Sequence, residues 1–191
     1  MKAILMSIRP QWVAKILNGE KTIEIRKRFP KDFVGWVYIY CTKEDSLSRL
    51  KDYPNDRYVC EQNFKCEDFP KLDSGYEGKG KVVARFWCDK VDKVHLRFEK
   101  YCAGELSQDG LLKYACLTEQ ELDNYLWSNC CIGCAIHITK LKIFDKPKEI
   151  SEFFTHKMLG CEGCCEYCDN QKCRLTRAPQ SWCYVEALNN E

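Results

Sequence analysis

The spacing of hydrophobic residues over the first thirty residues is typical first of a strand, then of a helix, and then of a second strand. Residues 3–7 are mostly apolar and predict a short buried strand. Pro10 suits the first turn of a helix, where the N–H that proline lacks is not needed. The apolar positions that follow recur at helical spacing, and they are Trp12, Val13, Ile16 and Leu17. Gly19 predicts the end of this helix, because glycine adopts a left-handed backbone at little cost.

Strict alternation begins directly after this helix and predicts a strand over 22–28. Ile23 and Ile25 point to one side of the predicted strand. The other side carries one hydroxyl, one carboxylate and two guanidinium groups, from Thr22, Glu24, Arg26 and Arg28. Lys21 lies at the corner between helix and strand. Two interpretations stay open, namely a solvated strand face with an ion pair or a polar site that holds a ligand.

Further strands and helices follow from the same patterns. Alternating or continuous apolar runs predict strands over 35–42, 80–89 with an extension towards residue 95, 131–143 and 182–186. Helical segments are expected over 43–50, after Thr118 and as one turn within 146–154. Thr118 and Glu121 have the spacing of a capping box, and Leu122, Tyr125 and Leu126 are expected to form the buried face of this helix.

Two segments interrupt these patterns. Residues 51–78 are rich in charged and turn-forming residues without a period, and 155–175 are rich in cysteine. Both are interpreted as insertions into a single domain that covers 1–191. The expected fold class is therefore α+β, mainly β, with about six short strands, flanking helices and a cysteine-rich loop.

Charge is informative only locally. The formal net charge of the chain is +2, but residues 21–31 contain five basic residues and one acidic residue, a net charge of +4. Such a patch attracts phosphate groups, or it is a solubilising edge. No apolar run approaches the ~18 residues of a membrane span. The first residues become polar too soon for a signal peptide, so a cytoplasmic protein without membrane contact is expected.

The 15 cysteines need a separate explanation, because an odd number of thiols in a chain without a signal peptide argues against a disulfide framework. The densest group supplies four thiols at spacings close to those of a zinc knuckle, and they are Cys161, Cys164, Cys168 and Cys173. Cys165 is a spare thiol or replaces Cys164. A structural Zn²⁺ is the expected cofactor; a metal-free loop and an iron–sulfur cluster are the alternatives.

These residues together resemble a known family. Three features are similar to activating signal cointegrator homology (ASCH) domains, above all the small phage- and prophage-type members of bacteria. They are the run from Ser7 through Pro10 to Trp12, the helix, and the pattern G-x-K-x-x-E-x-R formed by Gly19, Lys21, Glu24 and Arg26. The likeness covers 1–50, 79–154 and 176–188. It implies a small β-barrel of the PUA-like superfold, with the hallmark residues in a cleft between helix and barrel.

The resemblance also implies a ligand, namely single-stranded RNA or a nucleotide, with duplex DNA as the alternative. In this interpretation Arg26 and Arg28 hold phosphate, Glu24 accepts a hydrogen bond from a base edge, and an aromatic ring stacks on the base. The expected nucleic-acid contacts are Arg9, Trp12, Lys21, Glu24, Arg26, Arg28, Gln180 and Trp182. Trp12 is otherwise a core residue.

Some members of the family are hydrolases, either ribonucleases or amidohydrolases that deacylate N4-acylcytidine. In such an enzyme Lys21, Thr22, Glu24 and Arg26 are the candidate catalytic residues, with Lys21 as base if burial lowers its pKa. The chain departs from the amidohydrolase branch, since Glu24 occupies the position of the branch's nucleophilic threonine. Glu119 is one turn away from the position of its carboxylate. A third possibility is a phage-borne module that binds a host protein through the cysteine-rich loop.

Overall fold

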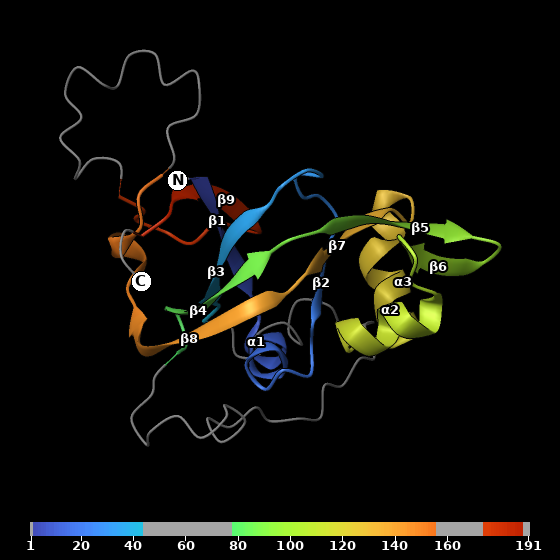
Figure 1. Cartoon of the computed structure of the whole chain (residues 1–191), viewed down its shortest axis with the longest axis horizontal. Helices are drawn as coiled ribbons and strands as arrows, with labels where there is room; N and C mark the ends of the chain where they lie inside the picture. Colours follow the sequence, from blue (N-terminus) through green and yellow to red (C-terminus); the bar gives the residue numbers. More distant parts are fainter. Residues whose placement is uncertain (1, 44–77, 156–173, 189–191) are drawn as a thin grey trace, which may run out of the picture.

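The computed structural model describes residues 2–43, 78–155 and 174–188 (Figure 1). Three predicted segments lie almost entirely outside these residues, namely the helix over 43–50 and the insertions 51–78 and 155–175. The described part contains nine β-strands, three α-helices and two short 3₁₀ turns, which confirms the α+β, mainly β class. The nine strands are arranged in two sheets.

The larger sheet has five strands in the order β8-β4-β3-β1-β9. Their bounds are Lys2–Ile8 for β1, Gly35–Cys41 for β3, Val82–Cys88 for β4, Thr139–Lys148 for β8 and Trp182–Glu186 for β9. β1 and β3 pair in parallel, and the other neighbours pair antiparallel. The central strands β1 and β3 are buried on both faces along most of their length, which explains their continuous apolar runs.

The smaller sheet has four antiparallel strands in the order β2-β7-β5-β6. Their bounds are Ile23–Arg26 for β2, Val91–Arg97 for β5, Lys100–Ala103 for β6 and Gly133–His137 for β7. β2 is therefore shorter than the predicted strand over 22–28. Its four residues are all buried, including the two that carry charge.

One long antiparallel ribbon joins the two sheets (Figure 1). β4 leads through two residues into β5, and β7 leads through one residue into β8. Because β4 pairs with β8 and β5 pairs with β7, both chains of the ribbon pass from the larger to the smaller sheet. A single strand was predicted over 80–89 with an extension towards residue 95, and another over 131–143. Each of these predictions thus merged two strands that belong to different sheets.

The three helices are α1 (Pro10–Leu17), α2 (Gln108–Ala115) and α3 (Glu119–Leu126). α2 and α3 pack with Leu111, Leu122 and Leu126 against the smaller sheet (Figure 1). The predicted capping box is present, since the Thr118 side chain accepts from the Glu121 amide and Glu121 bonds back to Thr118. The predicted helical turn within 146–154 is the 3₁₀ turn Ile150–Glu152. α2 was not predicted.

Candidate functional site

The segment with the G-x-K-x-x-E-x-R pattern connects α1 to β2 and is held by backbone hydrogen bonds on both sides. Gly19 has a φ of +75°, so the chain leaves the helix through a left-handed residue as expected. The Lys21 amide donates to the Lys15 carbonyl at the end of α1. The Thr22 amide donates to Tyr114 of α2, and the Thr22 carbonyl accepts from Ile138. The segment is thereby fixed between both sheets.

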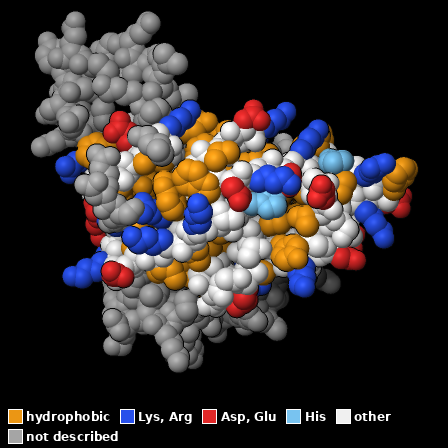
Figure 2. Space-filling model, viewed as in Figure 1, with side chains coloured by type: hydrophobic (Ala, Val, Ile, Leu, Met, Phe, Trp, Pro, Cys, Tyr) orange, Lys and Arg blue, Asp and Glu red, His pale blue; other side chains and the backbone are white. Residues whose placement is uncertain are grey.

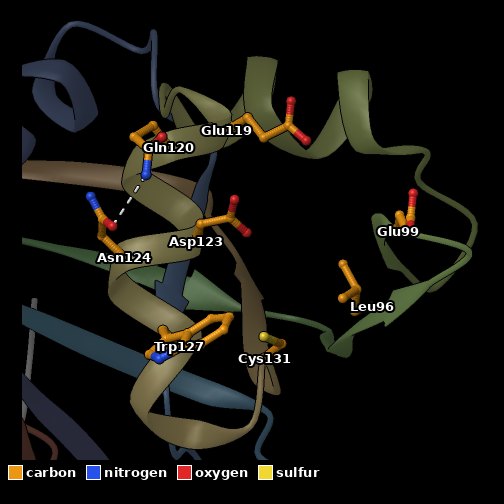
Figure 3. A pocket seen from close by; sticks show the side chains of 8 residues that line it. All are labelled: Leu96, Glu99, Glu119, Gln120, Asp123, Asn124, Trp127 and Cys131. Atoms are coloured by element: carbon orange, nitrogen blue, oxygen red, sulfur yellow. Dashed lines mark hydrogen bonds between the residues drawn. The ribbon is translucent and has the colours of Figure 1, made fainter.

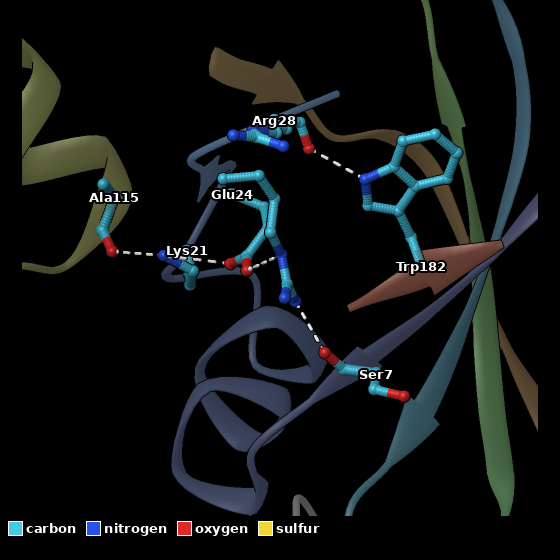
Figure 4. A network of polar contacts seen from close by, with 7 residues as sticks. Ser7, Lys21, Glu24, Arg28, Ala115 and Trp182 are labelled. Atoms are coloured by element: carbon cyan, nitrogen blue, oxygen red, sulfur yellow. Dashed lines mark hydrogen bonds and ion pairs between the residues drawn. The ribbon is translucent and has the colours of Figure 1, made fainter. Parts of the chain in front are cut away.

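Lys21, Glu24 and Arg26 form a buried ionic triad (Figure 4). They are only 2%, 6% and 9% exposed, so the interpretation of a solvated strand face is wrong. Glu24 lies between the two cations, with its Oε2 3.4 Å from Lys21 Nζ and its Oε1 3.0 Å from Arg26 Nε. Taking three charges out of water is costly, and their mutual contacts offset that cost.

Lys21 is held on the α2 side of the triad. Its Nζ donates to the Ala115 carbonyl at the end of α2, with a distance of 2.6 Å. The same nitrogen is 5.2 Å from the centre of the Trp12 ring. Burial lowers the pKa of Lys21, and the neighbouring Glu24 carboxylate opposes this shift without cancelling it. The sequence left the balance between burial and carboxylate open; in the structure, burial is the larger effect.

Arg26 is held on the side of the larger sheet. Its Nη2 donates to the Ser7 carbonyl of β1 with a distance of 2.7 Å. Its Nε is buried and ion-paired with Glu24, but has no acceptor aligned for a hydrogen bond within the described residues. Ser7 in turn donates from Oγ to Pro179 (2.6 Å) and from its amide to Ser181. The triad thus links α2, β2 and β1 to the segment before β9.

The other predicted site residues lie around the triad. Thr22 precedes β2 and is exposed; Arg9, Arg28 and Gln180 are also exposed, and Trp12 is half-buried. Trp182 donates from Nε1 to the Arg28 carbonyl (2.8 Å), as Figure 4 shows. The Trp182 ring is in edge contact with Phe29 and Tyr184, with ring centres 5.6 Å and 5.4 Å away. The ring is therefore less accessible than the sequence alone indicated.

Two aromatic residues lie in this region although sequence reasoning did not assign them to it. Tyr125 was expected in the buried face of its helix but is 37% exposed, and the charges of Arg26 and Glu24 act on its pKa. Burial, the largest influence, raises that pKa. Tyr114 is 42% exposed, and its carbonyl accepts the hydrogen bond from Thr22. We call Trp12, Tyr114 and Tyr125 the aromatic rim of the triad.

Each ring of the aromatic rim has a lysine nearby. Lys15 Nζ is 5.1 Å from the Trp12 ring centre, Lys27 Nζ is 5.1 Å from that of Tyr125, and Lys113 Nζ is 5.9 Å from that of Tyr114. Cations at this range interact favourably with aromatic faces. Two of these pairs, Lys15 with Trp12 and Lys113 with Tyr114, are close in sequence on one helix, a signal that is too common to be specific.

The cysteines of the predicted zinc site, Cys161, Cys164, Cys165, Cys168 and Cys173, lie outside the described residues. Within 2–43, 78–155 and 174–188, no group of three or more His, Cys, Asp or Glu side chains is placed to hold a metal ion. None of the described helices is long and apolar enough to span a bilayer.

Comparison with known proteins identifies the fold. No family model matches the sequence, and no curated protein matches it. Among solved structures, a serine-to-alanine variant of the ASCH protein from Zymomonas mobilis aligns over 96% of this chain and 88% of its own, with 14% identity and a TM-score of 0.52. The chain has the fold of an ASCH domain.

Two further structures of the same Zymomonas mobilis protein align with lower scores. The unmodified protein aligns over 96% of this chain and 87% of its own, with 16% identity and a TM-score of 0.48. A tyrosine-to-phenylalanine variant aligns over 78% and 77%, with 15% identity and a TM-score of 0.47. The alignment with the serine-to-alanine variant confirms the predicted resemblance to ASCH domains for the fold. The residues that contact a ligand have to be argued from the chain itself.

Proposed function

We propose that this ASCH-fold protein binds single-stranded RNA or a nucleotide, with bases stacked on the aromatic rim. The observation that carries the proposal is the set of three partly exposed rings around the triad, each with a lysine within 6 Å of its centre. Rings stack on unpaired bases, and the neighbouring ammonium groups attract the phosphates that connect those bases. The exposed Arg28 adds a guanidinium suited to phosphate.

Charge on its own would not support this assignment. On the face shown in Figure 2, basic and acidic side chains are interspersed over the described surface. The combination of ring and cation is therefore the more informative feature, because it matches both chemical parts of a nucleotide. Single-stranded ligands are favoured over duplex DNA, since bases inside a duplex are not free to stack on protein rings.

In this proposal the triad acts as a support and makes little direct contact with the ligand. Lys21 Nζ and Arg26 Nη2 already donate to Ala115 and Ser7, and both side chains are almost fully buried. Those bonds hold α2 and β1 against the segment that carries Thr22. The three rings come from α1, α2 and α3, so their common placement depends on this support.

A hydrolase is the second candidate, and the lowered pKa of Lys21 is the observation that favours it. A lysine with a lowered pKa is a better base, and Thr22 next to it supplies an exposed hydroxyl. The substrate would be RNA or N4-acylcytidine. Lys21 would have to leave the Ala115 carbonyl to reach a substrate, which is why binding is placed first.

The test is fluorescence anisotropy with a labelled single-stranded RNA of about twelve nucleotides, at low salt and over a salt series. Tyr125→Ala should weaken binding by about 1–3 kcal/mol, or roughly 5- to 150-fold in Kd, as expected for the loss of one stacked base. Phe98→Ala is the matched control, because Phe98 is 88% exposed with the Arg97 guanidinium 5.5 Å from its ring, away from the triad. Its Kd should stay that of the parent.

The same samples separate the alternatives. Duplex DNA of equal length should compete poorly, and log Kd should rise with log salt concentration because phosphate contacts release counterions. Analysis of the RNA and of N4-acetylcytidine after incubation reports hydrolysis, which Lys21→Ala should abolish if Lys21 is the base. Equal affinity of Tyr125→Ala and Phe98→Ala for RNA would refute the assignment of the aromatic rim.

A further inference from the structure

A second site lies on the opposite face of α3 from Tyr125. A pocket of about 370 Å³ opens between α3 and the hairpin of β5 and β6 (Figure 3). Its walls include three carboxylates, one indole, one leucine and one thiol, from Glu99, Glu119, Asp123, Trp127, Leu96 and Cys131. This volume is within the range of sites for small molecules.

The acidic wall follows from helical geometry. Glu119, Asp123 and Trp127 are spaced four residues apart, so they lie above one another along one face of α3 and its 3₁₀ extension. Figure 3 shows them directed towards the hairpin that carries Leu96 and Glu99. Among the described residues that line the pocket there is no lysine, arginine or histidine. Phosphate-bearing ligands are therefore disfavoured here by repulsion, in contrast to the aromatic rim.

A buried hydroxyl lies next to two of the residues that line this pocket. Tyr101 of β6 is 1% exposed, and its OH has no hydrogen-bond partner of good geometry within the described residues. Burial first, and then contacts with Cys131 and Asp123, raise the pKa of Tyr101, and both of these neighbours line the pocket. An unpaired buried hydroxyl costs about 1–3 kcal/mol, so a ligand that bonds to it would recover a stabilising contact.

We propose that this pocket binds an organic cation, either an alkylammonium or a guanidinium group. The three carboxylates supply negative charge, and the exposed Trp127 ring supplies a face for a cation–π contact. Tyr101 OH, beside Asp123 and Cys131, is a further acceptor for the same ligand. A single metal ion is a poor match, because the carboxylates in the described part of the chain do not converge into a metal-binding group. An elongated or flat cation reaches carboxylates that lie apart.

Two sources of such a cation exist, a free polyamine and an arginine side chain of a peptide. Isothermal titration calorimetry with spermidine, and separately with acetyl-arginine-amide, distinguishes them on the full-length protein. We expect binding of at least one probe and none of acetyl-citrulline-amide, which is flat but uncharged. Asp123→Asn should weaken binding roughly fivefold or more. Glu186→Gln, an exposed carboxylate on β9, is the control for general loss of negative charge and should leave Kd unchanged.

Tyr101→Phe provides a readout that a structural role would not give. Removing the unpaired hydroxyl should leave the free protein as stable as the parent or more stable, while the cation binds less tightly. Absence of binding by both probes at millimolar concentration would overturn the proposal. Equal weakening by Asp123→Asn and Glu186→Gln would also overturn it, because it would show only a general effect of net charge. Loss of stability in Tyr101→Phe would show that the hydroxyl already has a partner in the protein.

Discussion

The buried triad makes a strong prediction for the substitution Glu24→Gln. The amide has nearly the same shape as the carboxylate but no charge, so Lys21 and Arg26 would remain buried without a counterion. Both cations are less than 10% exposed, so solvent has little access to compensate for the lost charge. The variant therefore tests the charge of Glu24 with little change in volume.

The expected magnitude follows from measurements on buried ion pairs. Removing one partner of such a pair costs about 3–5 kcal/mol, whereas an exposed pair is worth about 0–1 kcal/mol. Because a domain is typically stable by about 5–15 kcal/mol, the loss is a large fraction of the total. For a chain of this size, each kcal/mol lowers Tm by about 2–4 °C, so Glu24→Gln should lower Tm by roughly 6–20 °C.

Urea denaturation followed by circular dichroism measures this free energy, and calorimetry gives Tm. Glu149→Gln is the matched control, because Glu149 forms an ion pair with Lys81 at the surface, with the two side chains 58% and 35% exposed. The glutamine keeps an acceptor for the 3₁₀ turn that follows. The control should lose no more than about 1 kcal/mol. Glu24→Gln and Glu149→Gln with the same free energy of unfolding would refute the argument that burial makes the triad important.

Two other predictions concern the cysteines. Burial raises the pKa of Cys41 and of Cys88 to about 12, so from about pH 9 to 12 the unfolded chain releases protons that the folded chain keeps. The free energy of unfolding should therefore fall with rising pH in reducing buffer, by up to about 1.4 kcal/mol per pH unit for each thiol. The fall should be less steep in Cys88→Ala, and an equal slope in parent and variant would contradict this prediction. The cysteine-rich segment should hold about one zinc per chain by elemental analysis. The double variant Cys161→Ser, Cys164→Ser should lose this zinc and Cys102→Ser should retain it, whereas metal-free parent protein would disprove the site.

The sequence predicted the local features of the site well, because these depend on neighbouring residues. The end of α1 at Gly19 and the alternation of β2 need only backbone preference and side-chain period. The burial of Lys21 depends on Ala115, which is 94 residues away along the chain, and on how α2 packs. No local pattern reports such a distance. The sequence thus left open whether the polar side of β2 is solvated, and in the structure its Glu24 and Arg26 are buried.

The strand boundaries illustrate a second limit of pattern reading. The apolar positions shift by one residue at Lys90 and at Lys140, close to where the hydrogen-bond partners change from one sheet to the other, and the prediction passed over both shifts. Side-chain period reflects which face is covered and carries no information about the partner strand. The exposure of Tyr125 has a similar origin. Leu122 and Leu126 fill the space against the narrow four-stranded sheet, and Tyr125 lies at its margin.

The position of the triad also bears on how sequence patterns of this kind should be used to assign function. Its three charges join β1, β2 and α2, so a chain can need the pattern G-x-K-x-x-E-x-R simply to hold its two sheets together. Chains that share the pattern can then differ in ligand, since the exposed rings come from positions outside it. In this chain, the pattern is evidence of architecture. Specificity should be sought by comparing the residues that occupy positions 12, 114 and 125.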